Sequence, residues 1–169
     1  RLNSLPSHLF IGLFEQVIER IAAKNQTKQL AHKWAPVAKK FSAVWIADAS
    51  TLEALKKHLG QLQEKTGRLL GGKILMVVEA FTHCQVEVWY DTNPNCNETT
   101  WWEDLLRRLP IGGLIIVDMG FYGFEWFDAL TEAGKYVLTR QKEKVKYNVV
   151  RTLSKSSHYK DEIIQMGLH

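Results

Sequence analysis

Apolar and polar positions alternate along the chain with two different periods, and each period predicts an element. Helical spacing of apolar residues over 7–24, with Ser7 at a suitable capping position, predicts a first helix. A shorter helical pattern over 27–41 predicts a second helix that is limited or bent at Pro36. Together these segments predict an introductory helical layer over residues 1–40.

Strand patterns begin after this layer. An apolar run over 42–47 predicts a buried strand that Asp48 terminates, and leucines at helical spacing predict a helix over 51–65. Alternating residues over 73–81 and 84–91 predict an antiparallel hairpin.

The second half of the chain repeats the alternation of helices and strands. Asn97 is suited to cap a helix that stops before Pro110. Further predicted elements are a strand at 114–118, a helix at 123–133 closed by Gly134, strands at 136–142 and 146–154, and a short unassigned piece at 160–167. The order of elements predicts a mixed α/β fold.

Length and composition fit one soluble domain. The chain has 169 residues, of which 46% are apolar and 24% charged. No apolar run reaches the roughly 20 residues that cross a bilayer, and no signal segment opens the chain, so we expect a cytoplasmic protein without a membrane partner. Cys84 and Cys96 are too few for a disulfide scaffold and are not spaced as a zinc site.

Positive charge is concentrated near the C-terminus. The net charge is +4, and residues 135–160 hold eight lysines and arginines against Glu143 alone. A polyanion is the natural partner of such a segment. On charge alone, a solvated lysine-rich surface explains the segment equally well.

Two aspartates share one sequence context, because Asp48 and Asp118 each follow an apolar strand and precede a turn and a helix. If the two strands are parallel neighbours, both carboxylates emerge at the same end of the sheet and need a cation between them. Carboxylates suit Mg²⁺ or Mn²⁺, and a pair of such ions supports in-line displacement at phosphorus. The alternative is that one aspartate caps the following helix and the other is incidental.

Two segments, VWIADAST and GGLIIVDMGFYGFEWFDALTEAGKYVLTRQK, resemble the first and second aspartate blocks of the DDE transposases of bacterial insertion sequences, especially the insertion-sequence-four group. The resemblance covers residues 41–146. It implies a ribonuclease-H-like catalytic core there, followed at 147–169 by the start of an inserted β-rich segment. It also implies a metal-dependent endonuclease that cleaves DNA at transposon ends and joins the freed 3′-hydroxyl to target DNA.

The resemblance assigns roles residue by residue. Asp48 and Asp118 would be the first two catalytic acids and would hold Mg²⁺ or Mn²⁺. Arg140 and Lys142, on the strand after the second aspartate, match basic positions of the family. The predicted contacts to DNA phosphates are Arg140, Lys142, Lys144, Lys146 and Arg151. Gly120 would let the backbone turn sharply beside the site, and the full-length protein would act in the nucleoid as a homodimer.

The chain also departs from the family pattern. Met119 stands where the family usually has arginine, and nothing matches the helical tyrosine–arginine–glutamate–lysine signature that carries the third acid. Glu162 lies in a segment that could form a helix but lacks the tyrosine and arginine. We therefore expect the chain to be cut inside the inserted segment, with the glutamate beyond residue 169 and the fragment alone inactive.

The remaining candidates have structural explanations. Trp101 and Trp102 are predicted to pack in the core, and Ser50 and Thr51 are interpreted as helix caps. Tyr122 and Phe124 could line a DNA groove or pack, and His83 lies in the hairpin turn. Two rival functions remain: a non-catalytic basic α/β module that binds nucleic acid or a protein, and a nucleotide-binding domain, which lacks a phosphate-cradling glycine loop.

Overall fold

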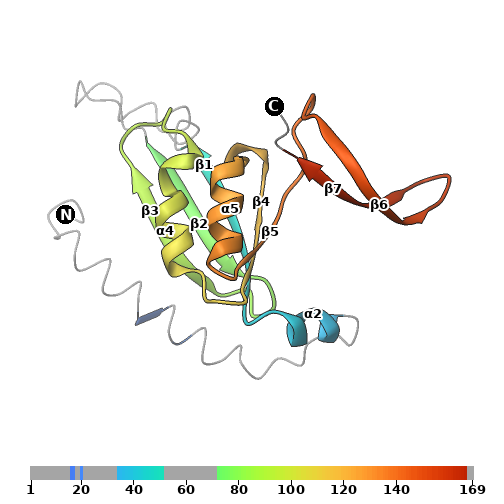
Figure 1. The fold of residues 1–169 in the computed structure, drawn as a ribbon. Helices are drawn as coiled ribbons and strands as arrows, with labels where there is room; N and C mark the ends of the chain where they lie inside the picture. The colour runs from blue at the N-terminus through green and yellow to red at the C-terminus, as the bar shows by residue number, and fades with distance from the viewer. Residues whose placement is uncertain (1–15, 18–19, 21–33, 52–71, 167–169) are drawn as a thin grey trace, which may run out of the picture.

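The structure is a computed structural model, and it describes residues 16–17, 20, 34–51 and 72–166. Residues 52–65 of one predicted helix, most of the predicted helix at 7–24, and residues 27–33 of the predicted helix at 27–41 lie outside these residues. Within the described part of the chain, five strands form a mixed sheet in the order β3-β2-β1-β4-β5, and β6 and β7 form a separate hairpin (Figure 1).

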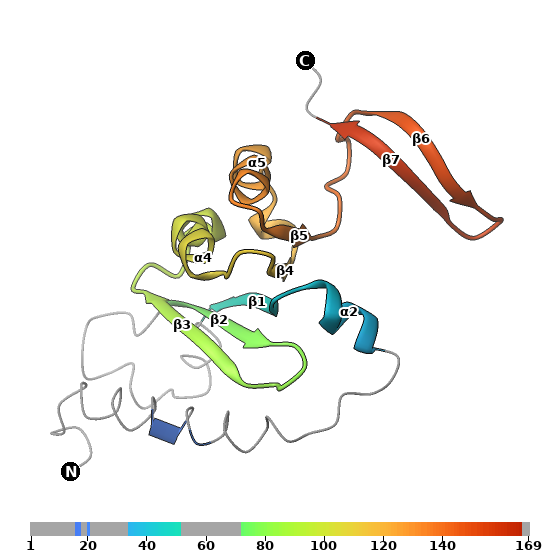
Figure 2. The same ribbon diagram turned by 60° about the horizontal axis from the view of Figure 1, so that its bottom comes forward.

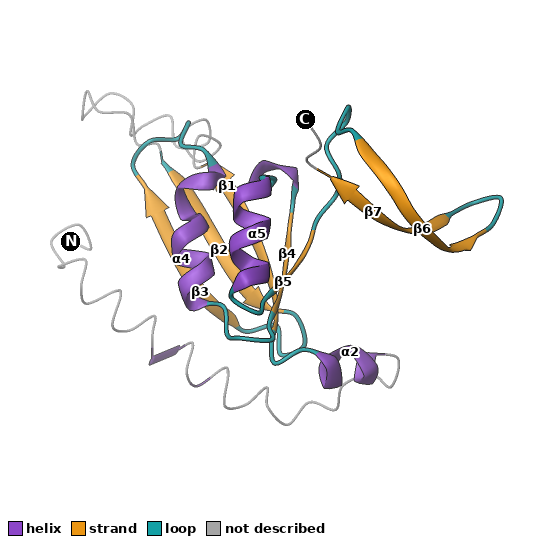
Figure 3. Cartoon of the chain, viewed as in Figure 1, coloured by secondary structure: helices purple, strands orange, loops and turns teal. Residues whose placement is uncertain are grey.

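The strands are β1 (Val44–Thr51), β2 (Lys73–Glu79), β3 (Gln85–Asp91), β4 (Leu114–Val117), β5 (Tyr136–Leu138), β6 (Tyr147–Lys155) and β7 (Lys160–Met166). The helices are α2 (Ala35–Lys40), α4 (Trp102–Arg108) and α5 (Phe124–Glu132), with the short 3₁₀ helices η4 (Glu98–Trp101) and η5 (Met119–Phe121). Figure 3 shows how helices and strands alternate along the chain.

The pairing of the strands confirms the predicted mixed α/β class. β2 with β3 is antiparallel, as predicted for the hairpin, and β1 with β2 is antiparallel as well. β1 with β4 and β4 with β5 are parallel, so the two aspartate-bearing segments are parallel neighbours, as the sequence analysis assumed.

One face of the sheet is covered by α4 and α5 (Figure 2). The strict alternation of β2 explains this arrangement, because Leu75 and Val77 are fully buried whereas Met76 between them is 44% exposed. Trp101 is 4% exposed and belongs to the core on the helix side, which confirms its predicted packing role.

The helix ends follow the predicted signals. The Asn97 side chain accepts a hydrogen bond from the Thr99 backbone N–H, which caps η4 ahead of α4. Gly134 follows α5 in the left-handed region (φ 67°), a conformation that glycine adopts without steric cost. Pro36 lies in the first turn of α2, where a missing backbone N–H costs no hydrogen bond.

The predicted end of the first strand at Asp48 is wrong. β1 continues to Thr51 because it remains paired with β2, and Asp48 lies opposite Met76 inside that antiparallel ladder. Ser50 and Thr51 are therefore strand residues. The error arose because a partner strand set the length of β1, while the apolar run ended earlier.

One prediction about the C-terminal half also needs correction. β5 ends at Leu138, so Arg140 and Lys142 lie in the connection after the strand. Residues 160–166, which the sequence pattern left unassigned, form β7 because they pair with β6, and Glu162 lies opposite Thr152 in that hairpin. The hairpin extends away from the sheet (Figures 1 and 2).

Cys84 and Cys96 are both buried. In the described part of the chain, no helix has the length and apolar character needed to span a bilayer.

Candidate active site

Asp48 and Asp118 follow a pair of residues that face each other on the neighbouring parallel strands β1 and β4. Ala47 of β1 lies opposite Val117, the last residue of β4. Asp48 is the next residue within β1, and Asp118 is the first residue after β4. Ala47 and Val117 are both buried, whereas both aspartates are exposed. The strand register thus brings these two residues, which are 70 positions apart in the sequence, to the same level along two adjacent parallel strands.

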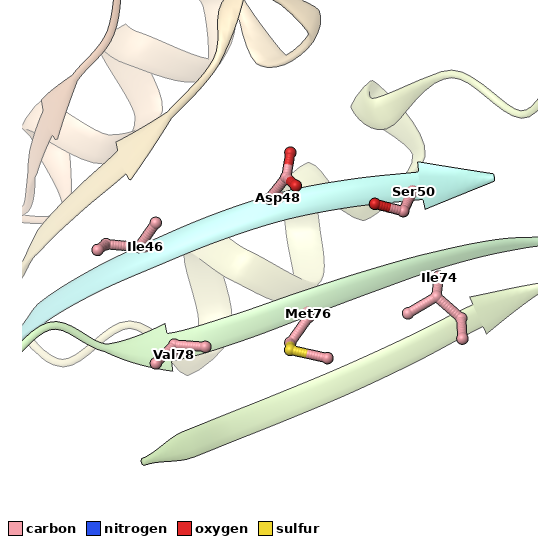
Figure 4. Close-up of a pocket in the computed structure, with 6 residues that line it drawn as sticks. All are labelled: Ile46, Asp48, Ser50, Ile74, Met76 and Val78. Atoms are coloured by element: carbon pink, nitrogen blue, oxygen red, sulfur yellow. The ribbon is translucent and has the colours of Figure 1, made fainter. Parts of the chain in front are cut away.

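Asp48 lies on the face of the sheet opposite the helices. It lines a pocket together with alternate residues of β1 and β2, namely Ile46, Ser50, Ile74, Met76 and Val78 (Figure 4). Within the described residues its carboxylate has no hydrogen-bond or ion-pair partner. Because the side chain is exposed and not engaged by these neighbours, its oxygens are accessible to a ligand.

Asp118 has a structural role as well. Its Oδ1 accepts a hydrogen bond of 2.9 Å from the Gly120 N–H and caps η5, and its backbone carbonyl accepts a bond of 3.1 Å from Thr139 Oγ1. The capping alternative is therefore confirmed for this residue. A carboxylate offers about four lone-pair sites, so the cap leaves further capacity to bind a cation.

A second charged pair lies beside Asp118, and the sequence analysis missed it. Lys73 is 8% exposed and donates a 2.9 Å hydrogen bond to the Cys96 carbonyl; its ammonium also forms an ion pair with Glu98. One signal could have found the lysine. It occupies the same strand face as Leu75 and Val77, and a lysine on a core-facing position needs a partner.

The electrostatic surroundings favour the ionised form of Glu98. Partial burial acts to raise the pKa of its carboxyl group, but the hydrogen bond from Lys73 and the charges of Lys73 and Lys142 outweigh burial. The pKa of Glu98 is therefore held below its ordinary value of 4.5.

Gly120 lies between the carboxylates of Glu98 and Asp118. A β-carbon at this position would lie 3.0 Å from Glu98 Cδ, and 3.1 Å from both Glu98 Oε2 and Asp118 Oδ1. The backbone of Gly120 has no positive φ. Glycine is thus favoured here because a side chain would crowd the two acidic side chains. The left-handed backbone conformation that the predicted sharp turn implied does not occur at Gly120.

The predicted DNA contacts are exposed but are not gathered at one point. Lys142 lies nearest the candidate site, with its ammonium 3.4 Å from the Tyr122 carbonyl and 5.6 Å from the centre of that ring. Arg140, Lys144 and Lys146 lie in the connection to the hairpin, and Arg151 lies on β6. Lys135 differs, because it is half-buried and donates to the Leu106 carbonyl of α4.

The aromatic candidates are mostly packed. Trp102 stacks on Trp126 with ring centres 5.8 Å apart, which confirms its predicted packing role. Tyr122 is 9% exposed, and burial raises the pKa of its hydroxyl. Phe124, at 38% exposure, remains accessible at the start of α5.

The donor set fits a hard divalent cation. Mg²⁺ binds through one or two carboxylates and retains several waters, so Asp48 and Asp118 supply suitable ligands. Among the described residues, no group of three or more histidine, cysteine, aspartate or glutamate side chains is arranged to hold a metal ion.

The fold and the site together are consistent with the ribonuclease-H-like class of transposase catalytic domains. A family model described as the transposase DDE domain matches residues 39–167. The chain belongs to this family, whose members are in general nucleases and strand transferases that depend on divalent metal ions. Comparisons with curated proteins and with solved structures found no match.

Proposed function

We propose that this chain is part of the catalytic domain of a DNA transposase of the insertion-sequence-four group, and that the full-length protein cleaves DNA at transposon ends and transfers the freed 3′-hydroxyl to target DNA. Asp48 and Asp118 would hold Mg²⁺ or Mn²⁺. When bound, such ions stabilise the attacking and leaving oxygens of an in-line displacement at phosphorus.

The observation that carries this proposal is the parallel register of Ala47 with Val117, which makes Asp48 and Asp118 the next residues of adjacent strands. If the two carboxylates converge, their like charges favour a cation between them. Family membership supplies a reaction in which such a cation is needed.

The other residues bind and orient the nucleic acid in this proposal. Lys142 beside Tyr122 would hold a DNA phosphate near the turn that follows Asp118. Arg140, Lys144, Lys146 and Arg151 would contact phosphates farther along the duplex, which adds salt-dependent affinity without sequence readout. Met119 cannot form the phosphate contact that an arginine would make at that position.

Further features of the proposal follow from the resemblance. We expect a third catalytic glutamate downstream of residue 169, a homodimer acting on paired DNA ends, and a bacterial nucleoid setting. Glu162 is not a candidate for the third acid, because it lies on β7 of the hairpin and not on a helix that faces Asp118.

A Mn²⁺ titration followed by electron paramagnetic resonance tests the proposal. The wild-type chain should bind Mn²⁺, and the Asp48→Asn, Asp118→Asn double variant should lose this binding. A matched control, Asp104→Asn with Asp161→Asn, removes the same charge elsewhere and should leave binding unchanged. If the first double variant binds Mn²⁺ as the wild type does, the metal-dependent function is rejected.

One observation favours the alternative of a non-catalytic basic module. The Asp118 carboxylate caps η5, which gives this residue a structural reason to be present without any metal. In that case the Asp118→Asn variant would lose stability without any change in Mn²⁺ binding, and DNA affinity would remain in the double variant.

A further inference from the structure

Lys73 and Glu98 form a charged pair whose position relative to Asp118 suggests more than a contribution to stability. Lys73 begins β2 on the core side, and its side chain is only 10% exposed. It holds the loop before η4 through the Cys96 carbonyl and holds the first residue of η4 through the Glu98 carboxylate. The buried ammonium group of Lys73 thus fixes the position of Glu98.

The second oxygen of Glu98 points toward the turn that carries Asp118. Glu98 Oε2 and Asp118 Oδ1 each lie 3.1 Å from the point where a β-carbon on Gly120 would be. Asp118 Oδ1 is held by the N–H of the same glycine. Two carboxylates therefore flank one residue, and one of them already has its own counter-ion.

We propose that Lys73 and Glu98 are positioning residues for Asp118: Glu98 supports the turn at Gly120, and Lys73 neutralises Glu98 so that it does not dominate the charge beside Asp118. This inference rests on the proposed function, because it concerns the affinity of Asp48 and Asp118 for a divalent cation. Neither Lys73 nor Glu98 is placed among the cation ligands.

The electrostatics give a prediction that a purely structural pair would not make. Glu98→Gln removes a negative charge near Asp118 and leaves the Lys73 ammonium uncompensated, so Mn²⁺ affinity should fall about tenfold. Lys73→Met leaves the Glu98 carboxylate uncompensated, so Mn²⁺ affinity should rise about threefold. Both variants should lose stability, because each leaves a partly buried charge without its partner.

The experiment measures Mn²⁺ affinity and the urea midpoint for both variants. Glu103→Gln and Lys39→Met, at exposed positions on α4 and α2, serve as matched charge controls. The proposal is supported if Glu98→Gln lowers Mn²⁺ affinity, Lys73→Met raises it, and both variants lose stability. Shifts in the same direction, or affinities equal to those of the controls, overturn it.

A variant that keeps all charges covers the case in which a single substitution prevents folding. Gly120→Ala crowds the carboxylates of Glu98 and Asp118 and shifts them by a few tenths of an ångström, so Mn²⁺ affinity should fall below that of the wild type. Wild-type affinity in this variant would also overturn the inference. If Asp48→Asn with Asp118→Asn abolishes Mn²⁺ binding but the variants of Lys73, Glu98 and Gly120 do not alter it, only this inference fails. If the Asp48→Asn, Asp118→Asn double variant binds Mn²⁺ normally, the proposed function itself fails.

Discussion

The two faces of the mixed sheet differ in what their side chains contribute. On the helix-covered face, Leu75 and Ile115 are completely buried, whereas on the opposite face Ile46 and Met76 are each 44% exposed and share a pocket with Asp48. Alternate residues of the same strands therefore either pack in the core or line the pocket that contains Asp48. The difference teaches that substitutions at neighbouring residues should separate effects on folding from effects on the proposed metal binding.

The largest expected effect is on the covered face. Leu75→Ala removes a fully buried side chain and should lower the free energy of unfolding by about 3 kcal/mol. Met76→Ala, on the next residue of the same strand, should cost less than about 1 kcal/mol. Urea denaturation measures both changes, and equal losses would show that the two faces do not differ as described.

A smaller effect is expected at the ion pair beside the covered face. Glu98→Gln should lower the free energy of unfolding by about 2 kcal/mol at neutral pH, since it removes a charged hydrogen-bond acceptor from Lys73. Because the folded-state pKa of Glu98 lies below 4.5, its stabilisation is present above pH 4.5 and is lost as pH falls through the folded-state pKa.

The difference between wild type and Glu98→Gln should therefore shrink in acid. Unfolding curves between pH 7 and pH 3 check this, with Glu103→Gln as the exposed control. A difference that stays constant over the whole range would contradict the assignment of a lowered pKa to Glu98.

Lys146 and Arg151 lie outside the five-stranded sheet, so their substitution should affect DNA binding alone. Lys146→Gln with Arg151→Gln removes two exposed charges and should reduce the salt dependence of DNA affinity by about two released ions. Fluorescence anisotropy at several salt concentrations measures the slope. Lys39→Gln with Lys40→Gln on α2 removes equal charge and should leave the slope unchanged; equal effects of the two pairs would remove the DNA-contact assignment.

The smallest effect on stability is expected on the face of the sheet opposite α4 and α5. Asp48→Asn replaces an exposed side chain without partners among the described residues, so the free energy of unfolding should change by less than about 0.5 kcal/mol. Differential scanning calorimetry checks this expectation. A loss of several kcal/mol would indicate that Asp48 stabilises the fold instead of serving a ligand.

Much of the fold was predictable because local patterns agreed with the tertiary structure. The alternation that predicted the hairpin matches β2 and β3, and the capping signals at Asn97 and Gly134 match the observed helix ends. The extension of β1 to Thr51 was not predictable, because it depends on pairing with β2. Residues 160–166 were ambiguous for the same reason, since only the register with β6 makes them a strand.

The candidate site was predictable in part. An aspartate after each apolar run was visible in the sequence, and the parallel pairing of β1 with β4 sets the residues before them, Ala47 and Val117, opposite each other. The pair of Lys73 and Glu98 was not visible, because its members are 25 positions apart and meet only when the loop before η4 folds against β2. The cap from Gly120 to Asp118 was one of two alternatives that the sequence could not separate.

The most direct test of the central claim is anomalous X-ray scattering from a crystal of this protein soaked in Mn²⁺. The account predicts a manganese peak in contact with carboxylate oxygens of both Asp48 and Asp118. A peak that touches neither aspartate, or carboxylates too far apart for one ion to contact both, would contradict it.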